Sequence, residues 1–353
     1  MPVTQKALAT HLGLTVGTVS RALNDYPDIS AETRARVRAA ADRLGYRANQ
    51  TARRLSIGTP ETVCYLMPRQ LGAHVPPFVA ELLAGLSDAL AVRNWDLLVV
   101  QSEAGAGDEE TLVKLIRSNR IGGVVLSRPL KTDPRIKLLT EMGCPFVVHG
   151  RTASSDAYAW YDVDGQEAFV TAVNHLVHLG HRRIAMICAP LQNAFAQQRL
   201  DGYRRGLRLN ALQVPEGYLQ VAEFSDAGGA SATRILMDLP RPPTGIVCAS
   251  DEMALGALAA IRDRGLEPGR DVSVIGYDGV HFGVHANPPL TTMAQPQARA
   301  GRRLGDMLLS LIDGADPRTE QELQRAHLVR RKTDGPPPKS VAMTDVSIRE
   351  ETT

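Results

Sequence analysis

TVGTVSRALN, at residues 15–24, has the spacing of an amphipathic helix. Val19 and Leu23 lie four positions apart, so on a helix they share one face, which packs inward while the other positions face outward. Thr15 is a suitable N-cap for this helix, and Gly13 supplies a tight turn just before it. The sequence therefore predicts a short helix that closely follows a glycine turn.

Two more helices are expected, one on each side of this helix. The first begins after Thr4 and carries apolar residues at helical spacing. The last begins after Ser30 and ends at Gly45, with an apolar stripe on one side and arginines on the other. Two short helices joined by a glycine turn are typical of a helix-turn-helix, whose second helix enters the major groove of DNA.

The charge of the chain is concentrated at its amino-terminal end. Up to Gly58 there are nine Lys and Arg against four Asp and Glu, a net charge of +5, so the remainder of a chain of net charge +2 carries −3. A basic head on a more acidic body is typical of a protein that binds a polyanion such as DNA.

Three segments of this region resemble one known family. They read LTVGTVSRALN at residues 14–24, SAETR at 30–34 and LGY at 44–46, and together they are similar to the headpiece of the LacI/GalR family of bacterial transcriptional regulators. The resemblance implies that the bases of double-stranded operator DNA are read by Val16, Gly17 and Arg21. It implies that the phosphate backbone is contacted by Thr15, Thr18, Ser20 and Asn24.

The residue types in these positions suit those roles. A guanidinium on the exposed face can bind O6 and N7 of guanine together, which discriminates against other bases by about 1–3 kcal/mol. Val16 offers only apolar contact, for example to a thymine methyl group, and Gly17 permits close approach. Sequence preference is therefore expected to depend mainly on Arg21.

Residues 49–60 connect the headpiece to the rest of the chain. Taken alone, they are a linker of indifferent helical propensity. The resemblance implies a hinge that becomes helical on DNA, pairs with its dimer mate and inserts Leu55 into the minor groove, where Ala52 allows close approach of the helices. A palindromic operator with a pyrimidine–purine step at its centre follows. The DNA contacts expected here are Asn49, Ala52, Arg53 and Leu55.

From Glu61 onward, short apolar runs alternate with amphipathic segments, the pattern of a doubly wound parallel α/β sheet. The resemblance implies a two-lobed core like that of periplasmic binding proteins. The expected domains are a headpiece at 1–48, a hinge at 49–60, a core at 61–332 and a disordered tail at 333–353. Lobe 1 is expected at about 61–161 and 291–320, and lobe 2 at about 162–290 and 321–332.

In parallel sheets, ligands bind beyond the carboxyl ends of the strands. Polar residues at those predicted ends include His149, Arg151 and Asp251, although Asp251 is better suited to capping a helix than to contacting a ligand. The resemblance identifies Arg199 and Asp278 as effector-binding residues, with Ser250 and Phe224 as further contacts. The complete set expected to bind a small-molecule effector is Phe78, Ser127, Arg128, Trp160, Arg199, Phe224, Ser250 and Asp278.

Other classes of protein lack support in the sequence. No apolar stretch reaches the ~18 residues of a membrane span and no signal peptide is visible, so a cytoplasmic protein without a membrane role is expected. The four cysteines show no Cys-x-x-Cys pair and are expected to be buried free thiols. His175, His178 and His181 do not form a convincing zinc motif, and the usual catalytic motifs are absent, so no metal, cofactor or catalytic residue is expected.

The favoured function is a dimeric repressor that a small molecule, a mono- or oligosaccharide, releases from a palindromic operator. A two-fold dimer is expected because one recognition helix reads too few bases and a palindrome needs a symmetric partner. One alternative is a corepressor-dependent repressor of the same family, for example purine-responsive. A second is a cytosolic sugar-binding or sugar-processing protein without a DNA role.

Overall fold

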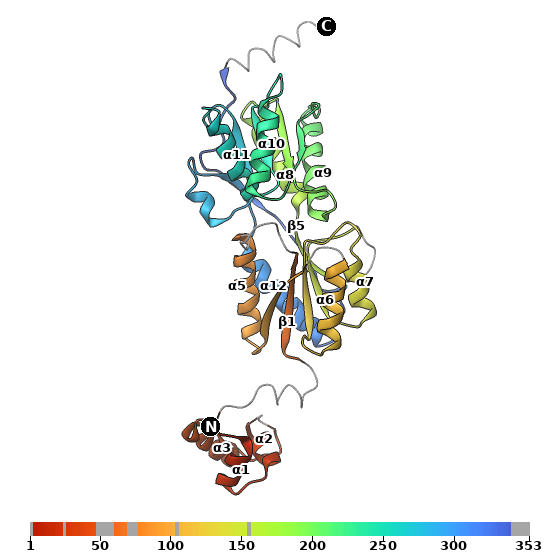
Figure 1. The fold of residues 1–353 in the computed structure, drawn as a ribbon, viewed down its shortest axis with the longest axis vertical. Coiled ribbons are helices and arrows are strands. Elements are labelled where there is room, and N and C mark those ends of the chain that lie inside the picture. Colours follow the sequence, from red (N-terminus) through yellow and green to blue (C-terminus); the bar gives the residue numbers. More distant parts are fainter. Residues whose placement is uncertain are drawn as a thin grey trace. The chain divides into compact units, whose positions relative to one another are not determined.

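A computed structural model describes residues 3–23, 26–46, 60–68, 77–102, 106–153 and 157–339 of the chain. The chain divides into two compact units, Met1–Pro60 and Glu61–Thr353. The first is a helical headpiece and the second contains two parallel-stranded sheets (Figure 1). The mixed α/β fold with an amino-terminal helix-turn-helix is therefore confirmed.

The headpiece contains α1 (Gln5–Leu12), α2 (Val16–Leu23) and α3 (Ala31–Leu44). Thr4 and Ser30 cap α1 and α3 through their side-chain oxygens, and Gly13 and Gly45 end those helices in the left-handed conformation. Thr15 caps α2, because its hydroxyl accepts a hydrogen bond from the Thr18 amide at 3.0 Å. Each predicted cap and stop is confirmed.

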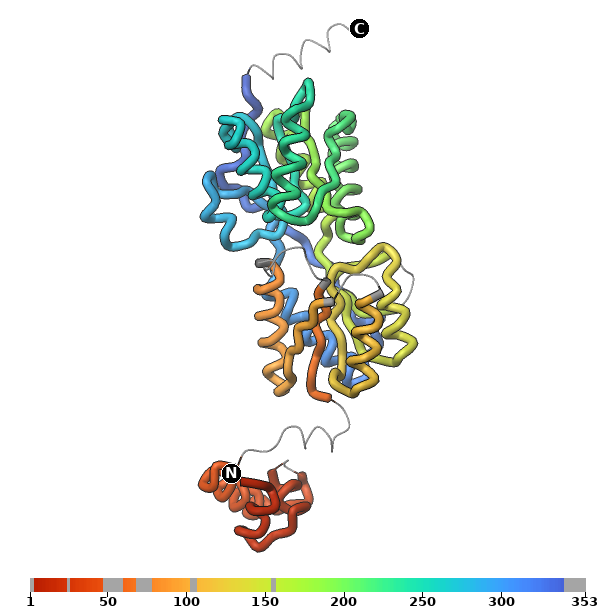
Figure 2. The backbone as a smooth tube through the Cα atoms, viewed as in Figure 1, coloured from red at the N-terminus to blue at the C-terminus, as the bar shows by residue number. Residues whose placement is uncertain are grey.

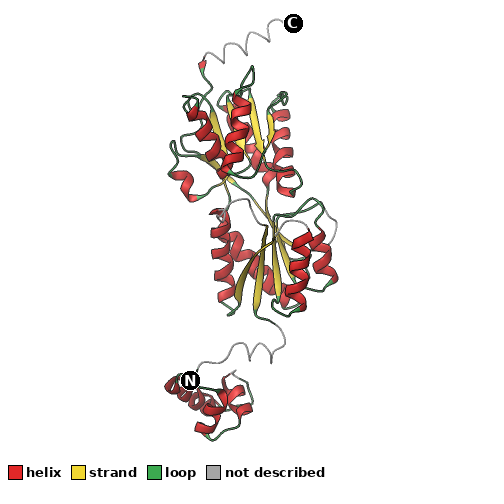
Figure 3. Cartoon of the chain, viewed as in Figure 1, coloured by secondary structure: helices red, strands yellow, loops and turns green. Residues whose placement is uncertain are grey.

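The first sheet forms lobe 1 and has the strand order β11-β5-β4-β3-β1-β2, with every pair parallel. Its strands are β1 (Thr62–Pro68), β2 (Asp96–Ser102), β3 (Gly123–Ser127), β4 (Phe146–His149), β5 (Ala159–Val163) and β11 (Gln321–Gln324). Its helices are α5 (Pro77–Ala91), α6 (Ala106–Arg117), α7 (Pro134–Glu141) and α12 (Gln297–Ile312). Alternate residues of β1 face two separate buried clusters, so helices cover both faces of this sheet (Figure 3).

The second sheet forms lobe 2 and has the order β12-β10-β9-β8-β6-β7, with only β12 antiparallel to its neighbour. Its strands are β6 (Ile184–Cys188), β7 (Leu219–Val221), β8 (Gly245–Cys248), β9 (Ser273–Asp278), β10 (Thr291–Ala294) and β12 (His327–Val329). Its helices are α8 (Gly165–His178), α9 (Ala194–Leu209), α10 (Asp226–Met237), α11 (Asp251–Asp263) and the 3₁₀ helix η1 (His281–Val284). The four cysteines are buried and free, as predicted.

The chain crosses between the lobes after β5, after β10 and after β11 (Figure 2). The predicted lobe boundaries were wrong for two strands: β10 belongs to lobe 2 and β11 to lobe 1. The physical reason is hydrogen bonding between strands. Thr291 and Thr292 pair with Ile275 and Gly276 of β9, whereas the polar β11 pairs with β5. Neither strand has an apolar pattern that identifies its partner.

The predicted disordered tail begins too early. Thr333 is buried, and its side chain accepts a hydrogen bond from the Thr291 amide and donates one to the Val274 carbonyl. Asp334 lies 2.7 Å from Nε2 of His175, and Gly335 accepts a hydrogen bond from His181 at 2.8 Å. Small polar residues can therefore anchor this segment to lobe 2 without an apolar pattern, and residues 340–353 lie outside the described part of the chain.

None of the helices in the described parts of the chain combines the length and the apolar character needed to cross a bilayer.

Helices α5 and α12 lie side by side on one face of the first sheet, and glycines allow the contact (Figure 1). A Cβ atom at Gly301 would overlap the carbonyl oxygen of Leu82, and one at Gly85 would overlap the carbonyl oxygen of Ala298. The two backbones are therefore too close for any side chain at these positions. Helix α12 follows the second crossing, so this contact ties a late segment of the chain to lobe 1.

Gly301→Ala should destabilise the body even though alanine is the better helix former by about 1 kcal/mol. The added methyl group forces the two helices apart, and we expect the free energy of unfolding to fall by about 1–3 kcal/mol in urea denaturation. Gly17→Ala is the matched control, because a Cβ in α2 would meet nothing nearer than the Thr15 hydroxyl at 3.8 Å. A Gly301→Ala protein as stable as the parent would contradict the close packing.

Candidate functional site

Helix α2 exposes the face that the sequence predicts to contact DNA. Val16 is 44% exposed, and Gly17 and Arg21 are also exposed. Val19 and Ala22 on the opposite face are buried in the headpiece core. The outer face of α2 thus combines one apolar side chain, one glycine and one arginine within a single turn and a half.

The polar residues predicted to contact phosphate lie at and near the start of α2. The hydroxyls of Thr15 and Thr18 lie 2.9 Å apart, and Ser20 is half-buried. The start of a helix presents amide groups without intrahelical partners, which suits an anionic ligand. Five other predicted DNA contacts lie outside the described residues: Asn24, Asn49, Ala52, Arg53 and Leu55.

Arg21 has two neighbours that sequence reasoning did not identify. Its guanidinium forms an ion pair with the carboxylate of Asp28, and its Cζ lies 5.7 Å from the centre of the Tyr26 ring. Both neighbours belong to the turn between α2 and α3. No periodic pattern marks a turn residue as the partner of a helix residue seven positions earlier, so this contact depends on the path of the turn.

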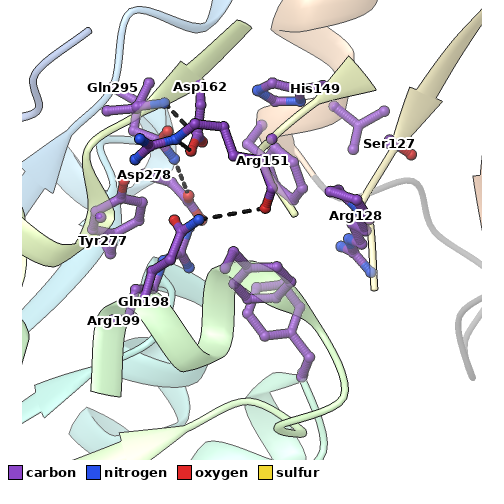
Figure 4. Close-up of a pocket in the computed structure, with 18 of the residues that line it drawn as sticks. Ser127, Arg128, His149, Arg151, Asp162, Gln198, Arg199, Tyr277, Asp278 and Gln295 are labelled. Atoms are coloured by element: carbon purple, nitrogen blue, oxygen red, sulfur yellow. Dashed lines mark hydrogen bonds and ion pairs between the residues drawn. The ribbon is translucent and has the colours of Figure 1, made fainter. Parts of the chain in front are cut away.

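A pocket lies in the body at the carboxyl ends of both sheets (Figure 4). About 730 Å³ of space lies among its lining atoms, including space open to solvent. The lining comes from both lobes: Tyr65, Met67, Phe78, Val79, Ser127, Arg128, Pro129, His149, Gly150, Arg151, Asp162, Val163, Gly165, Phe195, Gln198, Arg199, Phe224, Tyr277, Asp278 and Gln295.

Most of the predicted effector contacts line this pocket. They are Phe78, Ser127, Arg128, Arg199, Phe224 and Asp278. Trp160 does not line it and instead lies under the guanidinium of Arg151, whose Cζ is 5.3 Å from the ring centre. Ser250 is buried and caps α11, accepting a hydrogen bond from the Met253 amide at 3.2 Å. Both residues therefore support the pocket wall without reaching the pocket.

Asp251 does not cap a helix, contrary to one of its two predicted roles. Its carboxylate is buried and accepts hydrogen bonds from the amides of Gly279 and Val280, each at 2.8 Å, and from the Thr292 hydroxyl at 2.6 Å. Burial raises its pKa to about 6, and these hydrogen bonds oppose that rise. Asp251 thereby fixes the turn that follows Asp278.

Several pocket residues were missed from sequence. Asp162 and Gln295 follow the pattern already used, since Asp162 lies near the end of β5 and Gln295 directly follows β10, but the sequence analysis did not select them. Phe195 precedes Arg199 by four positions on α9, so the helical periodicity around Arg199 could have indicated it. Gln198, one position before Arg199, does not share that face and carries no such signal.

The charged groups of the pocket are arranged in opposite pairs. Nε of Arg151 lies 2.8 Å from Asp162, and the positive charge of Arg199 acts on Asp278. Burial raises the pKa of Asp278 to about 7, although Arg199 opposes the rise. Burial, together with the charges of Arg199 and Arg128, lowers the pKa of His149 to about 4, so this imidazole is neutral at physiological pH.

Two non-glycine residues of the pocket hold a left-handed backbone conformation. Arg128 has φ 49° and Asp278 has φ 124°, values that cost a non-glycine residue about 1–3 kcal/mol. Gly279, which follows Asp278, has φ 81°, and a Cβ there would overlap the Cβ of Ala294. A side chain at position 279 therefore has no space in this chain.

Guanidinium groups and aromatic rings alternate across the pocket. Cζ of Arg128 lies 5.5 Å from the ring centre of Phe78 in lobe 1 and 4.9 Å from that of Phe224 in lobe 2. The Phe224 ring packs edge-on against the Phe195 ring, with 5.4 Å between the ring centres. Cζ of Arg199 lies 4.6 Å from the centre of the Phe195 ring. This series of contacts joins the two lobes through the pocket.

Hydrogen bonds also join the lobes beside the pocket. The Ala194 amide donates to the Pro129 carbonyl at 3.0 Å, and the Lys131 amide donates to the Gln192 carbonyl at 3.1 Å. These bonds link the loop after β3 to the start of α9, so the two lobes are in contact along one edge of the pocket.

Family profiles match both units of the chain. The profile of bacterial regulatory proteins, lacI family, matches residues 6–49, and that of the periplasmic binding protein-like domain matches residues 173–333. The HTH-type transcriptional regulator AglR of Rhizobium meliloti (strain 1021) is 37% identical over 346 residues, which cover 96% of each chain.

Solved structures show the same similarity. The lac repressor dimer bound to operator and the anti-inducer ONPF superposes with a TM-score of 0.83 at 27% identity, covering 95% of this chain and 100% of that one. The complex of the transcriptional regulator CelR with cellobiose superposes with a TM-score of 0.72 at 29% identity, covering 94% and 99%. The helix-turn-helix, the two-lobed body and the full-length similarity agree, and the chain belongs to the lacI family of bacterial regulatory proteins, a family of DNA-binding transcriptional regulators.

Proposed function

We propose that this regulator is a repressor that binds a palindromic operator as a homodimer and is released when a sugar binds in the pocket between its lobes. The observation that carries the proposal is the pocket itself, which is lined from both lobes by paired charges and aromatic rings. The similar lac repressor, solved as a dimer on its operator, supports the proposed dimer and DNA partner, and the similar CelR, solved with cellobiose, supports a sugar as the ligand. An operator partner implies action in the bacterial cytoplasm.

The pocket suits a neutral, polyhydroxylated ligand. Its carboxylates, Asp162 and Asp278, can accept hydrogen bonds from hydroxyl groups, and each has a guanidinium acting on it, Arg151 on Asp162 and Arg199 on Asp278. Nε of Arg199 is buried and has no hydrogen-bond partner among the described residues, which costs free energy that a ligand oxygen would recover. The rings of Phe78 and Phe224 offer apolar surface to the faces of a sugar.

Binding in this pocket can act on DNA because its lining belongs to two lobes. A ligand that contacts Asp278 and Asp162 together favours one angle between the lobes over others. Lobe 1 begins at Glu61, immediately after the headpiece unit, so a change of angle alters the spacing of two headpieces in a dimer. We propose that the sugar-bound angle fits the operator less well.

A gel shift with the promoter fragment next to the regulator's own gene tests this function. Purified protein should bind that fragment and not a scrambled one at physiological ionic strength, and an inducing sugar should release it. The effector is found first by a thermal-shift screen of mono- and disaccharides and nucleobases. A ligand that strengthens DNA binding would instead identify a corepressor-dependent regulator, and equal binding of both fragments would contradict operator recognition.

The coupling between sugar and operator should be the same in both directions. If the sugar weakens operator binding by some factor, saturating operator must weaken sugar binding by that factor. Titration calorimetry of the screened sugar, with and without a palindromic duplex, measures it. An unchanged sugar Kd on operator would exclude the allosteric scheme.

Arg21→Ala should remove most of the preference for the native promoter fragment. Loss of a bidentate guanine contact costs about 1–3 kcal/mol of discrimination for each headpiece, whereas binding to scrambled DNA falls only slightly. Arg43→Ala is the matched control, because it removes the same charge from an exposed position in the last turn of α3. Similar loss of preference in both variants would assign Arg21 to the phosphate backbone.

The affinity for the sugar should fall as pH decreases through about 7. Asp278 has a pKa raised to about 7 in the free protein, and hydroxyl donors favour its ionised form, so binding is full above this pH and is lost below it. Well below the pKa, the Kd should rise about tenfold per pH unit. Calorimetry from pH 8 to 6 measures this slope, which Asp278→Asn should abolish while weakening binding at pH 8. A Kd independent of pH would show that the carboxylate does not accept from the ligand.

A further inference from the structure

We infer that Asp28 is a specificity-determining residue for DNA: it restrains the guanidinium of Arg21 so that this side chain reads guanine instead of moving to a phosphate. The inference rests on the proposed base-reading role of Arg21. It adds a residue outside α2, in the turn before α3, to the recognition surface.

The geometry around Arg21 combines an ion pair with a ring contact. Nη2 of Arg21 pairs with Oδ2 of Asp28, and the Tyr26 ring centre lies 5.7 Å from Cζ. The side chains of Arg21 and Asp28 are 52% and 44% exposed, so the pair lies at the surface beside the outer face of α2. The guanidinium therefore has fixed neighbours on the side of the turn and is open on the side of the solvent.

The turn that carries Asp28 is itself held in place. The Tyr26 amide donates to the Arg21 carbonyl at 3.1 Å, and the Ile29 amide donates to the Tyr26 carbonyl at 3.1 Å. Nη1 of Arg34 on α3 also lies 3.5 Å from the Tyr26 carbonyl, and Ile29 packs against the headpiece core. Asp28 thus extends from a turn that is bonded to both helices.

The shape of a guanidinium makes this restraint useful. Arginine has five N–H groups in one plane, and a carboxylate on one terminal nitrogen leaves other N–H groups of that plane for a second partner. Guanine O6 and N7 form a matching pair of acceptors, whereas a phosphate can be reached from many directions. A held guanidinium therefore favours guanine, and a free one is expected to contact the backbone as well.

The surroundings of the pair change when α2 enters the groove. In water, an ion pair between half-exposed side chains adds little to folding. In the groove, water is displaced and the local dielectric constant falls, so the same contact restrains Arg21 more strongly. The carboxylate is also repelled by the phosphates. Asp28 should therefore weaken binding to all DNA while it increases the preference for guanine.

Selection from a library of randomised palindromic duplexes tests this role with the full-length protein. Four proteins are compared: the parent, Asp28→Asn, Asp28→Glu and Asp42→Asn. Asp42 lies exposed on α3, so its variant removes the same charge from the same headpiece without touching the Arg21 contact. The Kd for the selected duplex, for its guanine-to-adenine variant and for a scrambled duplex is then measured as a function of salt.

We expect both neutral variants to bind the scrambled duplex more tightly, because each removes a negative charge. Only Asp28→Asn should lose discrimination against the guanine-to-adenine change, by about fivefold or more. The affinity of this variant should also fall more steeply with salt concentration, by the amount expected for about one additional phosphate contact. Asp28→Glu should retain part of the discrimination, since it keeps the carboxylate.

The outcomes separate this inference from the function on which it depends. If the parent protein selects no sequence, base reading by Arg21 fails and the proposed function fails with it. If the parent selects a guanine that Asp28→Asn prefers equally or more strongly, Asp28 only competes with DNA for Arg21 and the inference is overturned. Equal loss of preference in Asp28→Asn and Asp42→Asn would overturn it too, because the effect would then come from net charge.

Discussion

The ligand pocket depends on one buried carboxylate that never reaches it. Asp251, at the start of α11, binds the amides of the turn after β9 and the hydroxyl of Thr292 on β10. A buried carboxylate needs several such donors, because burial disfavours its ionised form. Even with these donors opposing the rise, burial leaves the pKa of Asp251 raised to about 6. By satisfying Asp251, the protein fixes a helix, a turn and a strand at the point where the chain leaves lobe 2. Asp278 is positioned by that turn.

The charged groups of the pocket are stabilised by neighbouring charges and aromatic rings. Guanidinium and carboxylate groups are costly to bury, so each is matched by an opposite charge or stacked on a ring. Arg151 pairs with Asp162, and Arg128 lies over Phe78 and Phe224. The Arg151–Asp162 pair lies within lobe 1, whereas the contact of Arg128 with Phe224 joins lobe 1 to lobe 2. A ligand that displaced Arg128 would therefore change a contact between the lobes.

The headpiece follows a different principle. Its helices are defined by side-chain caps and glycine stops at their ends, and its core is small, with Leu8, Val19 and Val37 fully buried. The face that we propose to contact DNA remains outside that core. Interactions on it, such as the pair between Arg21 and Asp28, add little to folding and are free to serve recognition.

Caps, glycine stops and apolar periodicity are local features. The three headpiece helices, the alternating strands and helices of the body, and most of the polar residues that line the pocket could therefore be predicted from the sequence alone. Ser127, Arg128 and Asp278 were identifiable because each ends a recognisable apolar strand. The folded chain was needed to assign β10 and β11 to their sheets, to find the hydrogen bonds that anchor Thr333 and to pair Arg21 with Asp28. These features depend on hydrogen bonds and charges that meet across the fold. The residues next to a polar residue in the sequence do not indicate which distant group will form its hydrogen bond or ion pair.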